Sequence, residues 1–144
     1  MDFSIGEMSK RTGVKVPTIR YYEKEGLLNA PMRSRGNQRR YRPADLERLG
    51  FIRHCRELGL PMTAIRDLIE LGQHPDKPCR QADRIAADQL KAVRRRIAHL
   101  TRLEAELKRI ATSCKGSHTV TECNVLKAFG DHGLCQSGHS AEDA

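Results

Sequence analysis

The feature that most constrains the fold is one long stretch without helix-breaking residues. From Cys79 to Thr112 the chain has neither Gly nor Pro, and its apolar residues stand mostly three or four positions apart. Several pairs, such as Leu90 and Ile97, are seven apart, which is the repeat of a coiled coil. The pattern predicts a single dimerisation helix over 79–112, and a helix of about 30 residues is about 45 Å long. The apolar positions are Ile85, Leu90, Val93, Ile97, Leu100, Leu103, Leu107 and Ile110.

A helix of this length cannot bury its apolar stripe within a chain of 144 residues. Hydrophobic residues make up 38% of the chain and Trp is absent, so a large hydrophobic core within a single chain is not expected. We therefore expect a partner helix, and a second copy of the chain is the simplest partner. No apolar run approaches the ~18 residues of a membrane span, and the first residues lack the apolar region of a signal peptide. These observations predict a cytoplasmic homodimer that does not enter a membrane.

The region before the long helix contains closely spaced capping and turn signals. Ser4 and Glu7 have capping-box spacing, and Gly13 provides a turn before Pro17, which suits the first turn of a second helix. A Gly-Asn pair lies between two basic arms in 32–41, which predicts a β-hairpin. The expected helices cover about 4–11, 17–24, 43–59 and 63–71.

Positive charge is concentrated in the same region. Residues 1–60 hold 13 Lys or Arg and 7 Asp or Glu, so they carry +6 of the chain's formal charge of +8. Two short helices joined at a Gly turn, followed by a basic hairpin, have the order of a winged helix-turn-helix. In such a module the second helix reads base edges in the major groove, and arginines of the wing contact phosphates. This order favours double-stranded DNA as the partner over a merely solvated basic face.

Three segments carry a resemblance to a known family: IGEMSKRTGVKVPTIRYYEKEGLL, RSRGNQRRY and DLERLGFIRHCRELGLPMTAIRDLI. With them the chain resembles the MerR family of bacterial transcription regulators over about residues 1–135. The resemblance implies a mainly α fold, with a winged helix-turn-helix in 1–71 and long helices that pair as an antiparallel coiled coil. It also implies a dimer that represses an over-spaced promoter and, with its effector, distorts the DNA so that RNA polymerase can use the promoter. The DNA contacts that it implies are Thr18, Arg20, Tyr21, Arg33, Arg35 and Arg39.

Five cysteines in a chain without a secretion signal argue against a disulfide framework. Cys79 begins the long helix, whereas Cys114 follows its end, about 50 Å away in the same chain. Cys123 lies nine residues beyond Cys114. In an antiparallel pair, Cys79 of one protomer would meet Cys114 and Cys123 of its partner. Three thiolates suit Zn, Cd, Pb or Hg, so we expect a divalent soft metal as the effector.

The resemblance narrows the choice of ion. A cysteine at position 79 resembles the divalent-metal branch of the family rather than the copper- and gold-sensing branch. His118 resembles the histidine ligand of the zinc-sensing members, which also have an adjacent Cys-Cys pair. Here that pair is Ser113-Cys114, so the cadmium- and lead-responsive members are closer.

The remaining thiols and the C-terminus are less constrained. The expected metal-binding loop and short helix span 113–135, and the tail 136–144 is expected to be disordered. Cys135, with His132 and His139 nearby in sequence, either supplies a further metal ligand or lies in solvent. Cys55 has the spacing of a small core residue, and surface or packing roles are expected for His54, His74 and His99.

The same residues bear on other functions. The chain has no HExxH motif, phosphate-binding loop or catalytic triad pattern, so an enzyme is not expected. A drug-binding regulator would need a larger domain after the long helix. The main alternative is a thiol redox-sensing regulator on the same fold, and a constitutive DNA-binding protein with a structural metal is the other.

Overall fold

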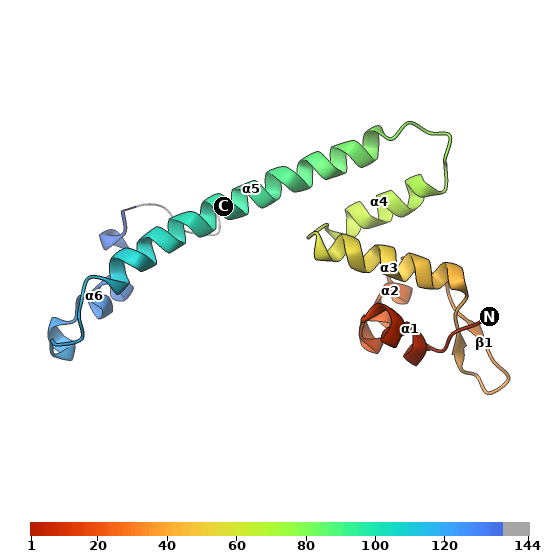
Figure 1. Cartoon of the computed structure of the whole chain (residues 1–144), viewed down its shortest axis with the longest axis horizontal. Coiled ribbons are helices and arrows are strands. Elements are labelled where there is room, and N and C mark those ends of the chain that lie inside the picture. The colour runs from red at the N-terminus through yellow and green to blue at the C-terminus, as the bar shows by residue number, and fades with distance from the viewer. Residues whose placement is uncertain (137–144) are drawn as a thin grey trace. The chain divides into compact units, whose positions relative to one another are not determined.

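The computed structural model describes residues 1–136, so His139 and nearly all of the tail expected to be disordered lie outside the described residues. Contacts divide the chain into two compact units, Met1–Ala86 and Ala87–Ala144, and helix α5 (Arg80–Ala111) crosses the boundary. The first unit contains α1 (Ile5–Thr12), α2 (Val16–Lys24), β1 (Met32–Arg33), β2 (Arg39–Arg40), α3 (Pro43–Glu57) and α4 (Met62–Gly72) (Figure 1). This order confirms the expected mainly α fold with two short helices followed by a hairpin.

Helix α1 begins and ends where the capping and turn signals predict. Ser4 Oγ accepts a hydrogen bond from the Glu7 N–H at 3.1 Å, and Glu7 Oε2 accepts one from the Ser4 N–H at 2.7 Å. Gly13 ends the helix with φ of 75°, and a Cβ at this position would lie 2.2 Å from Arg53 Nη1. Glycine therefore provides both the left-handed backbone and the space for the Arg53 side chain.

The core of the first unit joins all of its helices to the hairpin. Its largest fully buried side chains come from α1, α2, α3, α4 and the segments around the hairpin, and Ile85 of α5 packs partly against them. The fully buried residues are Met8, Ile19, Leu27, Tyr41, Leu49, Ile52 and Ile65. Ile19 and Tyr22 of α2 are part of this core, so α2 is packed against the other helices of the unit.

The hairpin is short and is extended by the N-terminus. Strands β1 and β2 pair antiparallel with Arg33 opposite Arg39, and Asn37 has φ of 61° in the turn between them. Just beyond β2, Tyr41 pairs with Phe3 through two backbone hydrogen bonds of 2.7 and 2.8 Å. The sequence predicted the hairpin but not this pairing with the N-terminal segment.

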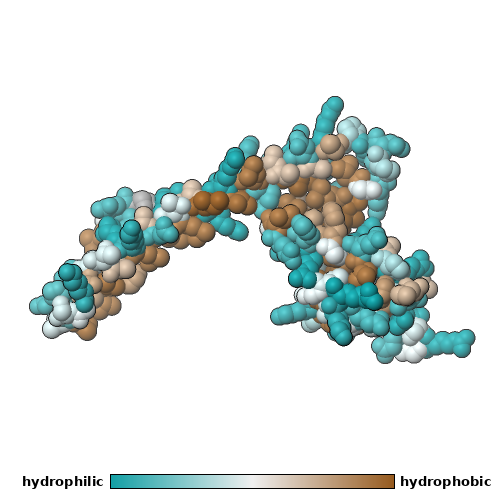
Figure 2. Space-filling view, in the orientation of Figure 1, coloured by the Kyte–Doolittle hydropathy of each residue, from teal (hydrophilic) through white to brown (hydrophobic). Residues whose placement is uncertain are grey.

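In the second unit, α5 leaves much of its apolar stripe in solvent. Leu90, Ile97 and Leu100 are 49%, 57% and 56% exposed, whereas Ile110 near the end of the helix is 6% exposed. Figure 2 shows brown and tan hydrophobic residues along the long helix. The sequence prediction of one long helix with an unburied stripe is confirmed, with bounds of Arg80–Ala111 rather than 79–112.

The segment after α5 folds back as short helical pieces. A 3-10 turn at Val120–Glu122 precedes α6 (Asn124–Gly130), and a second 3-10 turn covers His132–Leu134. The sequence predicted a short helix within 113–135, which α6 confirms, but neither 3-10 turn. In the part of the chain that the structure describes, no helix is both long and apolar enough to cross a membrane.

Candidate nucleic-acid interface and metal centre

Helix α2 presents the residues that the sequence singled out for DNA contact. Ile19 and Tyr22 face the core, with 0% and 7% exposure, whereas Arg20 and Tyr21 are exposed and Thr18 is half-buried. The Thr18 N–H donates to the Lys15 carbonyl at 2.9 Å, which starts the helix at the turn after α1. The helical period thus directs the basic and phenolic side chains outward, where they can donate hydrogen bonds to bases and phosphates.

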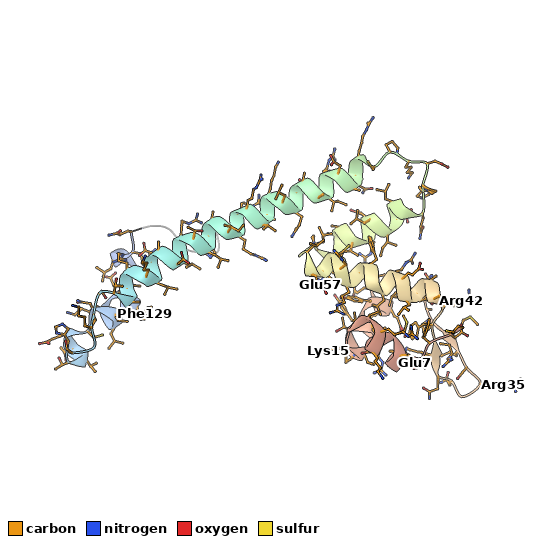
Figure 3. All side chains as sticks on the ribbon, in the orientation of Figure 1. Glu7, Lys15, Arg35, Arg42, Glu57 and Phe129 are labelled. Carbon is orange, nitrogen blue, oxygen red and sulfur yellow. The ribbon has the colours of Figure 1, made fainter. Side chains whose placement is uncertain are left out.

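The hairpin places two of the three expected wing arginines in solvent. Arg35 lies in the turn at the tip of the hairpin and points away from the helices (Figure 3). Arg33 is also exposed, and its Nη1 donates to the Asn37 carbonyl at 3.2 Å. Both guanidinium groups are available to a polyanion on the outer side of the hairpin.

The third expected wing arginine, Arg39, has a different environment. Its side chain is 26% exposed, and its Nε donates to Glu23 Oε2 at 3.2 Å. The other oxygen of Glu23 accepts a short hydrogen bond from the Tyr41 hydroxyl. Burial and, to a smaller extent, this hydrogen bond raise the pKa of Tyr41 well above its usual range, so the phenol stays protonated.

The loop after α5 brings two thiols together. Cys123 is the N-cap residue of α6, and the Cys114 thiol lies near enough to affect the pKa of the Cys123 thiol. The backbone N–H of Leu126 is the main cause that lowers the pKa of the Cys123 thiol, and the N–H of Val125, the Cys114 thiol and the Lys127 ammonium act in the same direction. Desolvation opposes them, and the net shift is downward. A thiolate, the form that binds soft metals, is therefore favoured here.

The other expected metal ligands lie apart from this thiol pair within one protomer. Exposed Cys79 immediately precedes α5, so all 32 residues of that helix separate it in the chain from Cys114. His118 is 52% exposed, and its Nδ1 lies 3.7 Å from Glu122 Oε2. Among residues 1–136 of a single chain, no three Cys, His, Asp or Glu side chains are grouped as a metal site would require. The expected ligands of one chain therefore do not form a three-ligand group within the described residues.

Cys135 lies in a different environment, beside an apolar cavity of about 210 Å³. The cavity lies between α5, α6 and the segment after α6, and Ile110, Phe129 and His132 also line it. Cys135 itself is half-buried. The sequence allowed Cys135 to be either a further metal ligand or a residue in solvent. In the structure its side chain packs partly against the protein.

Two carboxylates that the sequence did not single out hold the hairpin and the C-terminal segment in place. Glu23 holds the wing, as described above, and Glu106 of α5 holds the C-terminal segment. Glu106 is 5% exposed; its Oε2 lies 2.5 Å from Arg109 Nη2, and its Oε1 accepts from the Gln136 N–H at 2.7 Å. The sequence did contain a signal for the burial of Glu106, because this acidic residue stands three positions after Leu103, on the apolar side of α5.

The remaining histidine and cysteine predictions concern packing and surface positions. Cys55 is 6% exposed in the core, and burial raises the pKa of its thiol, so its expected core role is confirmed. His54 and His74 are exposed, and His74 Nε2 lies 3.3 Å from Glu70 Oε1. His99 of α5 is half-buried.

Comparison with known proteins identifies the family. Residues 3–71 match the model of the MerR HTH family regulatory proteins, and residues 46–110 match a model described as MerR, DNA binding. The chain is 37% identical over 129 residues to the HTH-type transcriptional regulator ZntR of Escherichia coli, covering 88% of this chain and 92% of the relative. It is 34% identical over 139 residues to the mercuric resistance operon regulatory protein of Shigella flexneri, covering 94% of both chains.

A solved structure supports the same relationship. The transcription regulator PbrR691 from Ralstonia metallidurans, solved in complex with lead(II), superposes with a TM-score of 0.76 at 37% identity. The match covers 88% of this chain and 98% of that chain. These likenesses extend from the paired short helices through the long helix to the loop that carries Cys114 and Cys123. The chain belongs to the MerR family of helix-turn-helix transcriptional regulators.

Proposed function

We propose that this protein is a metal-responsive transcriptional regulator that binds promoter DNA as a homodimer in the cytoplasm. A soft divalent ion is its effector, and the ion switches the dimer from repressing to activating metal-resistance genes. Relatives named for mercuric resistance and a structural neighbour in complex with lead(II) support this class of effector. The observation that carries the proposal is the paired Cys114 and Cys123 thiols at the N-terminus of α6.

On the DNA side, residues 1–71 act as the winged helix-turn-helix. Thr18, Arg20 and Tyr21 of α2 enter the major groove, and Arg33 and Arg35 of the wing bind phosphates. The outward position of Arg20, Tyr21 and both wing arginines supports these roles. The DNA partner is double-stranded promoter DNA, and the regulated enzyme is RNA polymerase at that promoter.

The dimer forms through α5, the helix that corresponds to the predicted dimerisation segment 79–112. Leu90, Ile97, Leu100 and Leu107 are each about half exposed, and together they form an apolar seam of heptad spacing. Packing this seam against the seam of an antiparallel copy removes it from water. An antiparallel arrangement also sets the start of one helix beside the end of the other.

The metal site then uses both chains. Cys79 of one protomer joins Cys114 and Cys123 of its partner, which gives the three soft donors that Cd, Pb, Zn and Hg accept. Exposure of Cys79 supports this role because the thiol is free to meet a second chain. His118 and Cys135 are candidates for a further ligand in the loop segment 113–135.

The test uses the full-length dimer and a duplex selected with the wild-type protein from a random-sequence pool. Each of Cd, Pb, Zn, Hg and Cu(I) is titrated while thiolate-to-metal absorption and ion stoichiometry per dimer are measured. Cys114→Ser is expected to abolish the thiolate absorption and the change in DNA conformation while leaving DNA affinity nearly unchanged. Cys55→Ala is the matched control, since that thiol is in the core of the first unit.

Two outcomes would overturn the metal proposal. One is a full response of the Cys114→Ser dimer to Cd and Pb. The other is a response of the wild-type dimer to hydrogen peroxide alone, with no response to any ion, which is the behaviour of a redox sensor. On the DNA side, Arg20→Ala is expected to weaken duplex binding with or without metal, and unchanged affinity at matched salt would refute the assignment of α2.

A further inference from the structure

Glu23 is a carboxylate on the helix that we propose to read DNA, yet its side chain is only 11% exposed. It lies in the last turn of α2, next to Lys24 and one turn after Arg20. A carboxylate facing the phosphates would oppose binding through like-charge repulsion. The structure instead turns this side chain towards the hairpin, where both of its oxygens accept hydrogen bonds.

Both donors to Glu23 come from the wing. Arg39 Nε donates to Oε2 at 3.2 Å from β2, and the Tyr41 hydroxyl donates to Oε1 from the residue after Arg40. These bonds join residues that are 16 and 18 positions apart in the sequence, so they fix the hairpin to α2. Hydrogen bonds to a charged acceptor are about twice as strong as neutral ones, and their geometry is more restricted.

The wing depends on such outside contacts. Each strand has two residues, and an isolated two-stranded hairpin of this size is marginally stable in water. The second anchor is the backbone pairing of Tyr41 with Phe3, at the base of the hairpin. Arg35 is at the opposite end, so a small rotation at the base moves its guanidinium through a larger distance (Figure 3).

Charge balance favours the same arrangement. The positive charges of Arg39 and Arg20 both act on Tyr41, opposite to the effect of the Glu23 carboxylate. Glu23 therefore accepts hydrogen bonds from one guanidinium group and one phenol, and the positive charge of Arg20 acts on the same phenol. The Glu23 carboxylate thus offsets the positive charge of Arg39 at the base of the wing.

We propose that Glu23 is the positioning residue that sets the wing relative to α2, and that Arg39 acts through Glu23 instead of contacting DNA. The phosphate contacts of the wing then come from Arg33 and Arg35. This inference rests on the proposed DNA-binding function and adds to it a specific division of roles among the arginines. Glu23 then strengthens DNA binding, although its negative charge alone would weaken binding to phosphates.

The experiment measures how the affinity for the selected duplex depends on salt, together with hydroxyl-radical footprints. Removing the carboxylate in Glu23→Ala frees the wing, so the phosphate contacts of Arg33 and Arg35 are lost. The slope of log K against log salt is expected to become shallower by about 1.8 per wing, which is about 0.9 for each of two contacts. Protection of the DNA backbone under the wing disappears, whereas protection under α2 remains.

Three further variants isolate the cause. Glu23→Gln keeps an oxygen acceptor for the Tyr41 hydroxyl and is expected to retain most of the wing footprint. Arg39→Ala in the Glu23→Ala background is expected to change the slope no further. The matched control is Glu25→Ala, which removes the same charge two residues further along the chain. The Glu25 carboxylate lies 3.9 Å from Arg66 and takes no part in the wing contacts. It is expected to leave the wing footprint intact.

Each alternative has a distinct result that overturns the proposal. If Glu23 only repels DNA, Glu23→Ala binds more tightly and the slope becomes steeper. If it only stabilises the fold, the thermal midpoint falls while slope and footprint stay unchanged. If Arg39 binds a phosphate itself, Arg39→Ala lowers the slope by about 0.9 per wing even without Glu23.

The proposal can also be tested if Glu23→Ala does not fold. Should Glu23→Ala fail to fold, Tyr41→Phe removes one donor with little change of shape and is expected to give an intermediate loss of wing protection. An unchanged wing footprint in Tyr41→Phe and in Glu23→Gln together would then overturn the proposal. Failure of the wild-type chain to bind any duplex would instead refute the proposed function, so the two failures are distinguishable.

Discussion

Replacing Glu106 by Ala is expected to release the C-terminal segment from α5 without unfolding the helix. Glu106 accepts from the Gln136 N–H at 2.7 Å, and it lies 2.5 Å from an Arg109 amino group that also donates to the Leu134 carbonyl at 2.7 Å. One buried carboxylate thus holds both sides of Cys135. Its removal leaves the segment with weaker contacts to α5.

The size of the effect follows from these contacts. A hydrogen bond to a charged group contributes about 1.5–3 kcal/mol, and two such bonds are lost. The Arg109 side chain is 35% exposed, so water replaces much of its interaction and reduces the total. The expected cost is about 1–3 kcal/mol for the closed segment, which corresponds to an opening constant about 5- to 150-fold larger.

Hydrogen exchange measures this opening directly. The amide of Gln136 is expected to exchange faster by the same factor in Glu106→Ala, because exchange under native conditions reports the local opening equilibrium. Glu106→Gln keeps an acceptor for that amide and is expected to show a smaller increase. Glu104→Ala is the control, since Glu104 is exposed on the same helix. Unchanged exchange at Gln136 in Glu106→Ala would refute the idea that this carboxylate secures the segment.

Three further predictions concern other parts of the chain. Cys123 is expected to react with iodoacetamide with a half-maximal rate below pH 9, because N–H donors favour its thiolate, whereas Cys55 requires a pH above 9 and slow opening of the core. Equal pH profiles would contradict this. Leu100→Glu places a charge in the exposed seam of α5 and is expected to shift sedimentation equilibrium towards monomer; an unaltered dimer would place the interface elsewhere. Gly13→Ala is expected to cost at least about 1–2 kcal/mol in urea unfolding, since alanine disfavours a φ of 75° and its Cβ would displace Arg53.

Features encoded by neighbouring residues could be predicted from the sequence. Ser4 and Glu7 cap α1 because both halves of the capping box lie within one turn. The seven-residue spacing in 79–112 predicted α5 and its exposed seam, because a period of apolar residues needs no knowledge of tertiary contacts. The family resemblance rests on such local motifs, and the family matches confirm it.

Contacts between distant residues could not be predicted. Glu23 and Tyr41 are 18 residues apart, and Glu106 and Gln136 are 30 apart, so neither pair has a sequence spacing that signals contact. In both cases the burial of a carboxylate depends on a donor supplied by another segment. The charge of Arg39 predicted a phosphate contact, but charge alone does not show that its Nε already has an acceptor within the protein.

The location of the thiols explains how an ion could control DNA at a distance. A ligand shifts a conformational equilibrium only by the difference in its affinity for the two conformations. An ion held by Cys114 and Cys123 alone would bind within one loop, so its affinity would not depend on how the two protomers are arranged. When Cys79 of the second protomer supplies the third thiolate, the strength of binding depends on the position of that protomer's α5, which begins at Arg80. The same helix packs Ile85 against the core of the DNA-binding unit. In the proposed dimer, the separation of Cys79 from the other two thiols along the chain thus couples the effector to the DNA-reading helices.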